Sequence, residues 1–343
     1  MFLYLGLIFG LTAFSLVVKA AVPEQEKGEQ LILILGIAAI FLLLVLKKDT
    51  VGLDTLGYRR QYRLAGTMPW RDFDYVYFEK GYLFLMKLFS KSGLPFRCFT
   101  GAIYGLLCAA YYRFLRKYAQ NVTLSLLILI CYQFLVFHIS GLRQSLAMGV
   151  CLFAFLSLDR GHPLRALALT LLAATFHRGA AAFALVFPVY ALRGRRFPGL
   201  LYPLGAAAAV ALRPVLWQLA GLVFSDISYP GGAEIGGNLV FLAGIAVFLL
   251  YTRAAKGSDG FLAHMAYTAL CCDLVLSGST LLRCNLFFTL FLIPGIPNAI
   301  RRCEHRTRLV LNVALGAFLI LLFYADTLAI NQLGLLPYRF FWE

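Results

Sequence analysis

Long apolar runs recur along the whole chain and are separated by short clusters of Arg, Lys, Gly and Pro. A run of about 20 apolar residues can cross a bilayer as a helix, and a helix satisfies its own backbone polar groups in lipid. Hydrophobic residues make up 61% of the 343 residues and charged residues only 14%, far from a soluble globular composition. The sequence therefore predicts an all-α, polytopic integral membrane protein with a single transmembrane domain over residues 1–343.

The apolar runs predict about twelve transmembrane helices, some of them short or broken. The first run has no basic stretch ahead of it, which favours a retained anchor over a cleaved signal peptide. The eighth holds Arg213-Pro214, which would split it, because proline interrupts a helix interior. The predicted spans are residues 2–18, 31–46, 94–112, 122–138, 142–158, 164–176, 179–192, 199–222, 238–251, 261–280, 285–300 and 309–328.

The basic residues of the short loops predict the orientation of the chain. About half of the 31 Lys and Arg fall in short loops on one side, and such loops mark the cytoplasmic side. The polar segment 47–97 then lies on the opposite side, because long segments cross the membrane largely regardless of charge. Segment 47–97 is therefore expected as an extracytoplasmic polar loop, and its part 78–91 as an amphipathic helix in the membrane interface.

Arg143, Arg178 and Arg283 stand at the ends of predicted helices, on the same side as Arg59 in segment 47–97. A charge inside a span costs about 2.5 to 3.5 kcal/mol, so such residues usually face a partner, a cavity or a substrate. Segment 47–97 mixes carboxylates and arginines with many tyrosines. Arginine forks match phosphate oxygens, and aromatic rings cover the apolar faces of sugars. The combination indicates a ligand with sugar and phosphate groups; the alternative for single residues is a solvated loop tied by surface ion pairs.

One residue, His177, has both a structural and a catalytic interpretation, whereas the other histidines, Asp72 with Asp74, and the cysteines indicate no metal site. His177 at a helix end is either bonded to a backbone carbonyl or part of an active site beside Arg178. The histidines have no ligand spacing, and Asp72-Phe73-Asp74 is too common a pattern in a polar loop to predict a metal site. The eight cysteines lie mostly in apolar runs, as small core residues do. We predict no metal, no cofactor and no nucleic-acid partner.

Several segments along the chain resemble, in their sequence order, the exopolysaccharide polymerases of the EpsG and Wzy type. The most specific pieces are Gly52 with Asp54 and Tyr58, the pair Arg143-Gln144, and Phe176-His177. Arg178 departs from the family pattern, which has a small or hydroxylated residue after the histidine. The resemblance covers nearly the whole chain, in the segments VGLDTLGY, EKGYLFLMKLF, ISGLRQSLAMGVCLFAF, LLAATFHRGAAAF, LLRCNLFF and LLPYRFFW.

The resemblance implies a GT-C-like membrane glycosyltransferase that acts on the outer face of the bacterial cytoplasmic membrane. Such a polysaccharide polymerase joins oligosaccharide repeat units, of the O-antigen kind, that are carried on polyprenyl pyrophosphate. The expected partners are this lipid-linked oligosaccharide, membrane lipids, a chain-length regulator and a flippase. The implied site comprises Asp54 and His177 as catalytic residues, Arg143, Arg178, Arg283 and Arg59 as pyrophosphate-binding residues, and Tyr58, Gln144 and Tyr338 as glycan-binding residues.

Two alternatives share some of these features. A flippase or transporter of lipid-linked glycans would also have basic residues in a cavity, but it should show related halves, which the sequence lacks. A membrane polysaccharide acyltransferase would use a catalytic histidine such as His138 or His177, together with an entry site for a cytoplasmic acyl donor.

Overall fold

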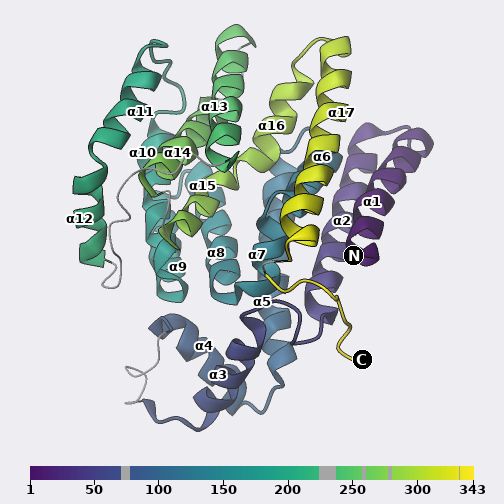
Figure 1. Cartoon of the computed structure of the whole chain (residues 1–343), viewed down its shortest axis with the longest axis vertical. Helices are drawn as coiled ribbons and strands as arrows, with labels where there is room; N and C mark the ends of the chain where they lie inside the picture. The colour runs from purple at the N-terminus through teal and green to yellow at the C-terminus, as the bar shows by residue number, and fades with distance from the viewer. Residues whose placement is uncertain (71–77, 224–236, 257–259, 277–279, 332) are drawn as a thin grey trace. The chain divides into compact units, whose positions relative to one another are not determined.

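In the computed structural model the regular secondary structure of the described residues is helical, and loops join the helices (Figure 1). Two compact units are present, Met1–Ala181 with Glu304–Glu343, and Ala182–Cys303. Within the described parts one isolated β-bridge joins Lys47 to Phe340. The described residues are 1–70, 78–223, 237–256, 260–276, 280–331 and 333–343.

The described residues of the first unit form ten α-helices and a terminal π-helical turn. Its helices are α1 Phe2–Ala21, α2 Gln25–Leu46, α3 Thr55–Thr67, α4 Lys80–Lys91, α5 Phe96–Tyr118, α6 Val122–Cys131, α7 Phe134–Ser140, α8 Leu142–Asp159, α9 Pro163–Phe176 and α17 His305–Leu322, followed by η4 Phe323–Ala329. A 3-10 helix, η2, covers Arg178–Leu185 and contains the boundary between the units.

The described residues of the second unit form two long helices, α13 and α14, and several short ones. They are α10 Val186–Ala191, α11 Leu201–Ala211, α12 Arg213–Val223, α13 Gly237–Lys256, α14 Gly260–Leu276, the 3-10 helix η3 Thr280–Asn285, α15 Leu286–Thr289 and α16 Leu292–Arg301. The break between α11 and α12 falls at Leu212, immediately before Arg213-Pro214, where the sequence predicted a split.

The core of the first unit is built around α8. This helix packs against α5 and α9, and α2 packs on α5. Nearly every side chain of α8 is buried, whereas α1 and α17 expose large apolar side chains such as Phe9, Leu16 and Val313. A helix that is apolar all round suits either a protein core or lipid. The central α8 therefore fits a protein core, and the outer helices α1 and α17 fit contact with lipid.

The predicted polytopic, all-α membrane architecture is confirmed. In the described part of the chain, six helices are long and apolar enough to span a membrane, and the bent pair α6 and α7 raises the number to seven. Shorter apolar helices occupy the other predicted spans. The number of twelve crossings and the GT-C-like arrangement remain predictions.

The predicted span 122–138 is bent and forms two helices, α6 and α7. The chain bends by 50° between α6 and α7, where Gln133 has a left-handed backbone with φ of 53°. That conformation ends the helical hydrogen-bond ladder, because L-residues in a right-handed helix need negative φ. The bend places Ser140 and the start of α8 at the end of the unit that carries the polar segment 47–97.

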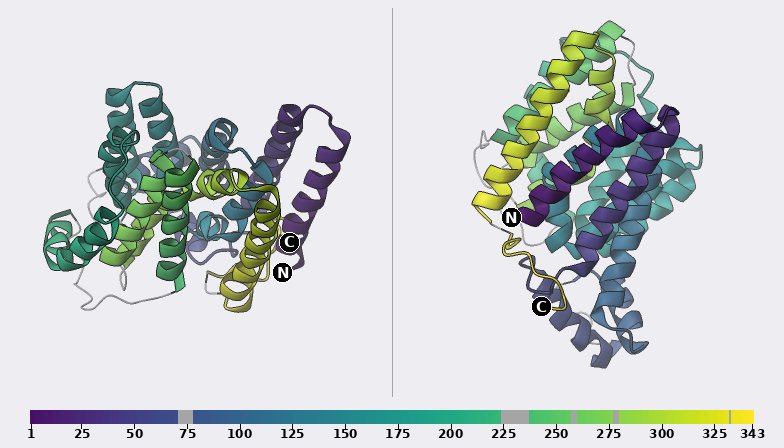
Figure 2. Two further views of the ribbon diagram at one scale, coloured as in Figure 1. Left: turned by 90° about the horizontal axis from the view of Figure 1, so that it is seen from above. Right: turned by 90° about the vertical axis from the view of Figure 1, so that its right-hand side faces the viewer.

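Helices α3 and α4, here called the cap, pack against the first turns of α5, where Phe99 contacts Tyr62 and Tyr82, and Figure 1 and the right-hand view of Figure 2 show the cap at one end of the first unit. The helix predicted over 78–91 is confirmed as α4, and α3 was not foreseen. Helix α3 buries Thr55, Tyr58, Tyr62 and Ala65, whose spacing of three or four residues places them on one face. The cap is therefore a folded helical pair rather than a loose loop.

Candidate functional site

Glu79 lies at the N-cap of α4 and collects contacts from two other segments. Its Oε2 accepts a hydrogen bond from Arg143 Nη1 at 2.5 Å, on the first turn of α8. Its Oε1 accepts the backbone N–H of Arg178 at 3.0 Å and lies 3.5 Å from His177 Nδ1, both just after α9. The Glu79 side chain is only 8% exposed. One carboxylate thus joins α4, α8 and the end of α9.

A close approach of α4 to α9 makes these contacts possible. A Cβ on Gly81 would lie 2.2 Å from Thr175 Oγ1 and 2.8 Å from the Thr175 carbonyl oxygen. Only glycine lets the two backbones come this near without a shift. Because Gly81 follows Glu79 by two residues and Thr175 precedes His177 by two, this contact brings the carboxylate beside the imidazole.

The electrostatics of the cluster keep Glu79 ionised. Burial alone would raise its pKa, but contact with His177, the nearby Arg143 guanidinium and the Arg178 backbone N–H together lower the pKa from 4.5 to about 2. Glu79 is therefore an anion at any physiological pH. It serves as a fixed counter-charge and cannot act as a general acid or base near neutrality.

Arg143 occupies a position that a helix disfavours for a cation, since the N-terminal end of a helix dipole is positive. Three contacts compensate. Glu79 supplies the charge, the Tyr58 hydroxyl lies 3.4 Å from Arg143 Nε, and the Phe78 ring lies 4.5 Å from the guanidinium carbon. Tyr58 and Phe78 also pack on Tyr82, which α4 buries. The guanidinium is thus held in one orientation by a carboxylate and an aromatic wall.

The loop that carries Asp54 is fixed to the α7–α8 corner. Gly52 has φ of 91° and sits so close to the Ile139 carbonyl oxygen that a Cβ would lie 2.8 Å from it. The Asp54 backbone N–H donates to Ser140 Oγ at 3.2 Å, and Lys47 Nζ donates to Thr55 Oγ1 at 2.8 Å. The Asp54 side chain is exposed at the N-cap of α3, one helical turn before Tyr58.

The structure brings together most of the residues proposed from the sequence and separates others. Asp54, Tyr58, Arg143, His177 and the exposed Arg178 all lie in the first unit, on or next to the elements around Glu79, and Gln144 is buried in the next position of α8. These residues are called the Glu79 cluster below.

The remaining three sequence candidates have other surroundings. Arg59 forms an ion pair with Asp49 at 2.8 Å. The Tyr338 hydroxyl donates to the Leu43 carbonyl at 2.8 Å, which ties the C-terminal segment to α2. Arg283 is exposed on η3 and belongs to the second unit.

His138 has a structural environment. It is 1% exposed, with Nε2 2.9 Å from the Tyr111 hydroxyl and Nδ1 2.9 Å from Ser145 Oγ. Both ring nitrogens are therefore engaged by hydroxyl groups of the α5–α8 core. A catalytic histidine needs one nitrogen facing its substrate, so His138 is a poor candidate for the acyltransferase alternative.

Metal ligands are not grouped in the described part of the chain, where no three His, Cys, Asp or Glu side chains could hold an ion together. Asp72 and Asp74 lie outside the described residues. The chemistry that the Glu79 cluster offers is instead that of a fixed cation, an imidazole beside a carboxylate, and an exposed carboxylate. Such a set can bind an anionic group and accept a proton from a neighbouring hydroxyl.

Sequence reasoning assigned no site role to Glu79 or Phe78. The available signal was their position immediately before the amphipathic helix, in a segment that also carries the resemblance EKGYLFLMKLF. A single carboxylate at the start of that helix is a candidate counter-charge for one of the isolated arginines predicted on the same side of the membrane.

Comparison with known proteins adds one finding. No curated protein and no solved structure matches the chain. A family model does match, over residues 31–340, and this range contains the whole Glu79 cluster. The chain therefore belongs to the EpsG family.

Proposed function

We propose that the protein is a membrane polysaccharide polymerase, a glycosyltransferase that joins oligosaccharide repeat units carried on polyprenyl pyrophosphate. Family membership indicates an exopolysaccharide polymerase-like membrane protein. The observation that carries the proposal further is the Glu79 cluster, in which Arg143 and His177 share one carboxylate next to a helical cap rich in tyrosine. The reaction takes place on the outer face of the cytoplasmic membrane, the side to which the short-loop charges assign segment 47–97.

The donor chemistry requires a cation for the leaving group. The bond between the anomeric carbon of the growing glycan and its pyrophosphate breaks, and a hydroxyl oxygen of the acceptor repeat unit forms the new glycosidic bond. Negative charge builds on the departing pyrophosphate. Arg143 is permanently charged and held by Glu79 and Phe78, so it needs no reorganisation to stabilise that charge. The exposed Arg178 adds a second positive charge two residues after Phe176.

The acceptor hydroxyl must lose its proton to a general base. Asp54 is the carboxylate that we favour, because its side chain is exposed while its backbone is anchored on Ser140. His177 is the rival. Glu79, fixed as an anion, would stabilise the imidazolium that forms when His177 takes the proton, as a carboxylate does for a catalytic histidine.

The glycan chains need sugar-binding surfaces near these groups. The buried Tyr58 holds its hydroxyl 3.4 Å from Arg143 Nε, and the buried Gln144 follows Arg143 on α8; both are proposed as glycan contacts. Arg59 is paired with Asp49 and partly exposed, so a phosphate could exchange with that carboxylate at small cost. Tyr338 and Arg283 complete the proposed set as a glycan contact and a pyrophosphate contact.

The test is a chromosomal deletion followed by mass spectrometry of lipid-linked oligosaccharides and of surface polysaccharide. Leaflets are distinguished by the accessibility of the glycan to an added glycosidase. We expect loss of polymer and accumulation of a single repeat unit on the outer leaflet. Accumulation on the inner leaflet would indicate a flippase, and intact polymer lacking acyl groups would indicate an acyltransferase; either result contradicts the proposal.

A further inference from the structure

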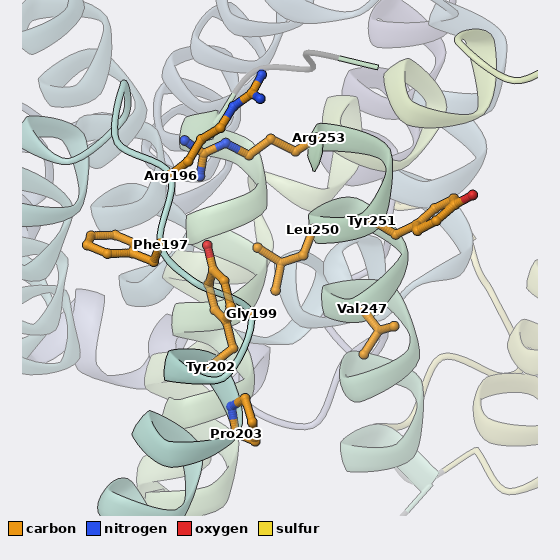
Figure 3. Close-up of a pocket in the computed structure, with 9 residues that line it drawn as sticks. All are labelled: Arg196, Phe197, Gly199, Tyr202, Pro203, Val247, Leu250, Tyr251 and Arg253. Carbon is orange, nitrogen blue, oxygen red and sulfur yellow. The ribbon is translucent and has the colours of Figure 1, made fainter. Parts of the chain in front are cut away.

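The second unit contains a cavity of about 470 Å³ that is remote in sequence from the Glu79 cluster. It lies between α13 and the start of α11 with the loop that precedes it (Figure 3). Arg196 and Arg253 contribute to its wall, together with Phe197, Tyr202, Val247 and Leu250. A volume of this size is typical of small-molecule sites, which range from about 300 to 1,000 Å³.

One end of the cavity is strongly basic. In Figure 3 the guanidinium groups of Arg196 and Arg253 lie at the same end, and the Tyr202 hydroxyl points toward them. Arg253 is 5% exposed, and its hydrogen bonds go to the neutral acceptors His264 Nε2, at 2.6 Å, and the Arg195 carbonyl. These bonds fix the guanidinium without neutralising it.

Neither arginine has a carboxylate within ion-pair distance among the residues that the structure describes. Two like charges that converge on one cavity repel each other, and an anion between them removes that repulsion. Phosphate is the anion that guanidinium groups match best, because its oxygens accept paired N–H donors. The basic end is therefore suited to a phosphate group.

The other part of the cavity is apolar. Val247 and Leu250 of α13 line it, and Figure 3 shows Leu250 pointing from α13 toward Tyr202. Val247 is 67% exposed and Tyr251 68%, so this flank of α13 is not covered by protein within the unit. An apolar flank of a helix in a membrane protein is covered by lipid chains. The cavity thus joins a phosphate-binding end to a surface suited to acyl chains.

The position in the membrane agrees with an anionic lipid. Arg193 to Arg196 and Arg253 to Lys256 belong to the short loops that predict the cytoplasmic side. Anionic phospholipids on that side attract basic residues near the surface, and basic pockets between spanning helices bind their headgroups.

We propose that this cavity binds one anionic phospholipid, with its phosphate between Arg196 and Arg253 and its acyl chains along Val247 and Leu250. The site is independent of the proposed polymerase activity, since it involves none of its residues. Bound lipid would hold α11 and α13 together at this end of the second unit.

The test uses the full-length protein in detergent and native mass spectrometry. The probes are dioctanoyl phosphatidylglycerol, dioctanoyl phosphatidylcholine, glycerol phosphate and inorganic phosphate. We expect a single saturable phosphatidylglycerol site and at least tenfold weaker binding of the other three. Equal binding of inorganic phosphate or glycerol phosphate would overturn the assignment to a lipid, and equal binding of phosphatidylcholine would overturn the role of the arginines.

Matched variants locate the site. Arg196→Gln changes an exposed loop residue and should weaken phosphatidylglycerol binding about tenfold, the loss expected for one charged hydrogen-bonding partner. Arg116→Gln removes the same charge from an exposed position on α5 and should leave binding unchanged. Arg253→Lys keeps the positive charge but removes the planar guanidinium that donates paired hydrogen bonds. Wild-type affinity in Arg196→Gln, or an equal loss in Arg116→Gln, would refute the proposed site.

Discussion

Replacing Glu79 by Gln tests whether one buried carboxylate holds the cluster together. The substitution keeps the size and the acceptor oxygen of the side chain but removes the charge that faces Arg143. The pKa of Glu79 falls from 4.5 to about 2 on folding, which corresponds to roughly 3 kcal/mol of interaction with the ionised form. Because the carboxylate is 8% exposed, solvent screens little of this. We expect Glu79→Gln to lose stability of about this size and most of its turnover.

The pH dependence of this effect has a definite sign. A carboxylate with a depressed pKa stabilises the folded state above its unfolded pKa and loses that contribution as the pH falls through its folded pKa. The contribution of Glu79 should therefore be constant above pH 4.5 and disappear between pH 4.5 and about 2. Thermal melts of the purified protein in nanodiscs, from pH 8 to pH 3, measure it in wild type and should show no such drop in Glu79→Gln.

Glu24→Gln is the matched control. Glu24 pairs with Lys27 at 2.9 Å, but both side chains are largely exposed, at 65% and 71%. Exposed pairs contribute about 0 to 1 kcal/mol, so this variant should melt and turn over like wild type. If Glu79→Gln and Glu24→Gln gave the same melting temperature and the same turnover, the argument that Glu79 fixes Arg143 would fail.

Three further substitutions separate charge, packing and catalysis. Arg143→Lys retains the cation but not the planar fork, and should reduce repeat-unit transfer at least tenfold with little change in melting temperature. Gly81→Ala places a methyl group against the Thr175 backbone and should destabilise by about 1–3 kcal/mol in thermal melts, whereas Gly57→Ala, where a Cβ meets nothing within 4 Å, should not. Asp54→Asn should lower turnover by about 100-fold or more if it is the base, measured as polymer formed per minute, and leave the melt unchanged because its carboxylate is exposed.

Much of the architecture could be predicted from the sequence because the physical constraint is strong. Lipid demands long apolar helices, so the spans from α1 to α17 are visible as hydropathy. A charge at a spanning-helix end is costly, so Arg143 stood out without any structure. His177, beside Arg178, stood out as a candidate site residue for the same reason. These features depend on local composition, which a sequence displays directly.

Other features depend on contacts that no local pattern records. Glu79 meets Arg143 and Arg178, which are 64 and 99 residues further along the chain, and several glutamates have similar sequence surroundings. No Pro or Gly next to Gln133 indicates the bend there in the sequence. Tyr338 carries the aromatic ring expected of a glycan contact, yet its hydroxyl is used to anchor the C-terminal segment on Leu43. Tertiary packing decides these positions.

The central claim is that the Glu79 cluster transfers lipid-linked repeat units, and reconstitution tests it most directly. Purified protein in proteoliposomes would receive the polyprenyl-pyrophosphate-linked repeat unit, and products would be measured by mass spectrometry. We predict glycans in whole multiples of the repeat unit, with one polyprenyl pyrophosphate released for each bond formed, and no products from a folded Arg143→Ala variant. Absence of elongation by wild type, or full elongation by Arg143→Ala, would contradict the account.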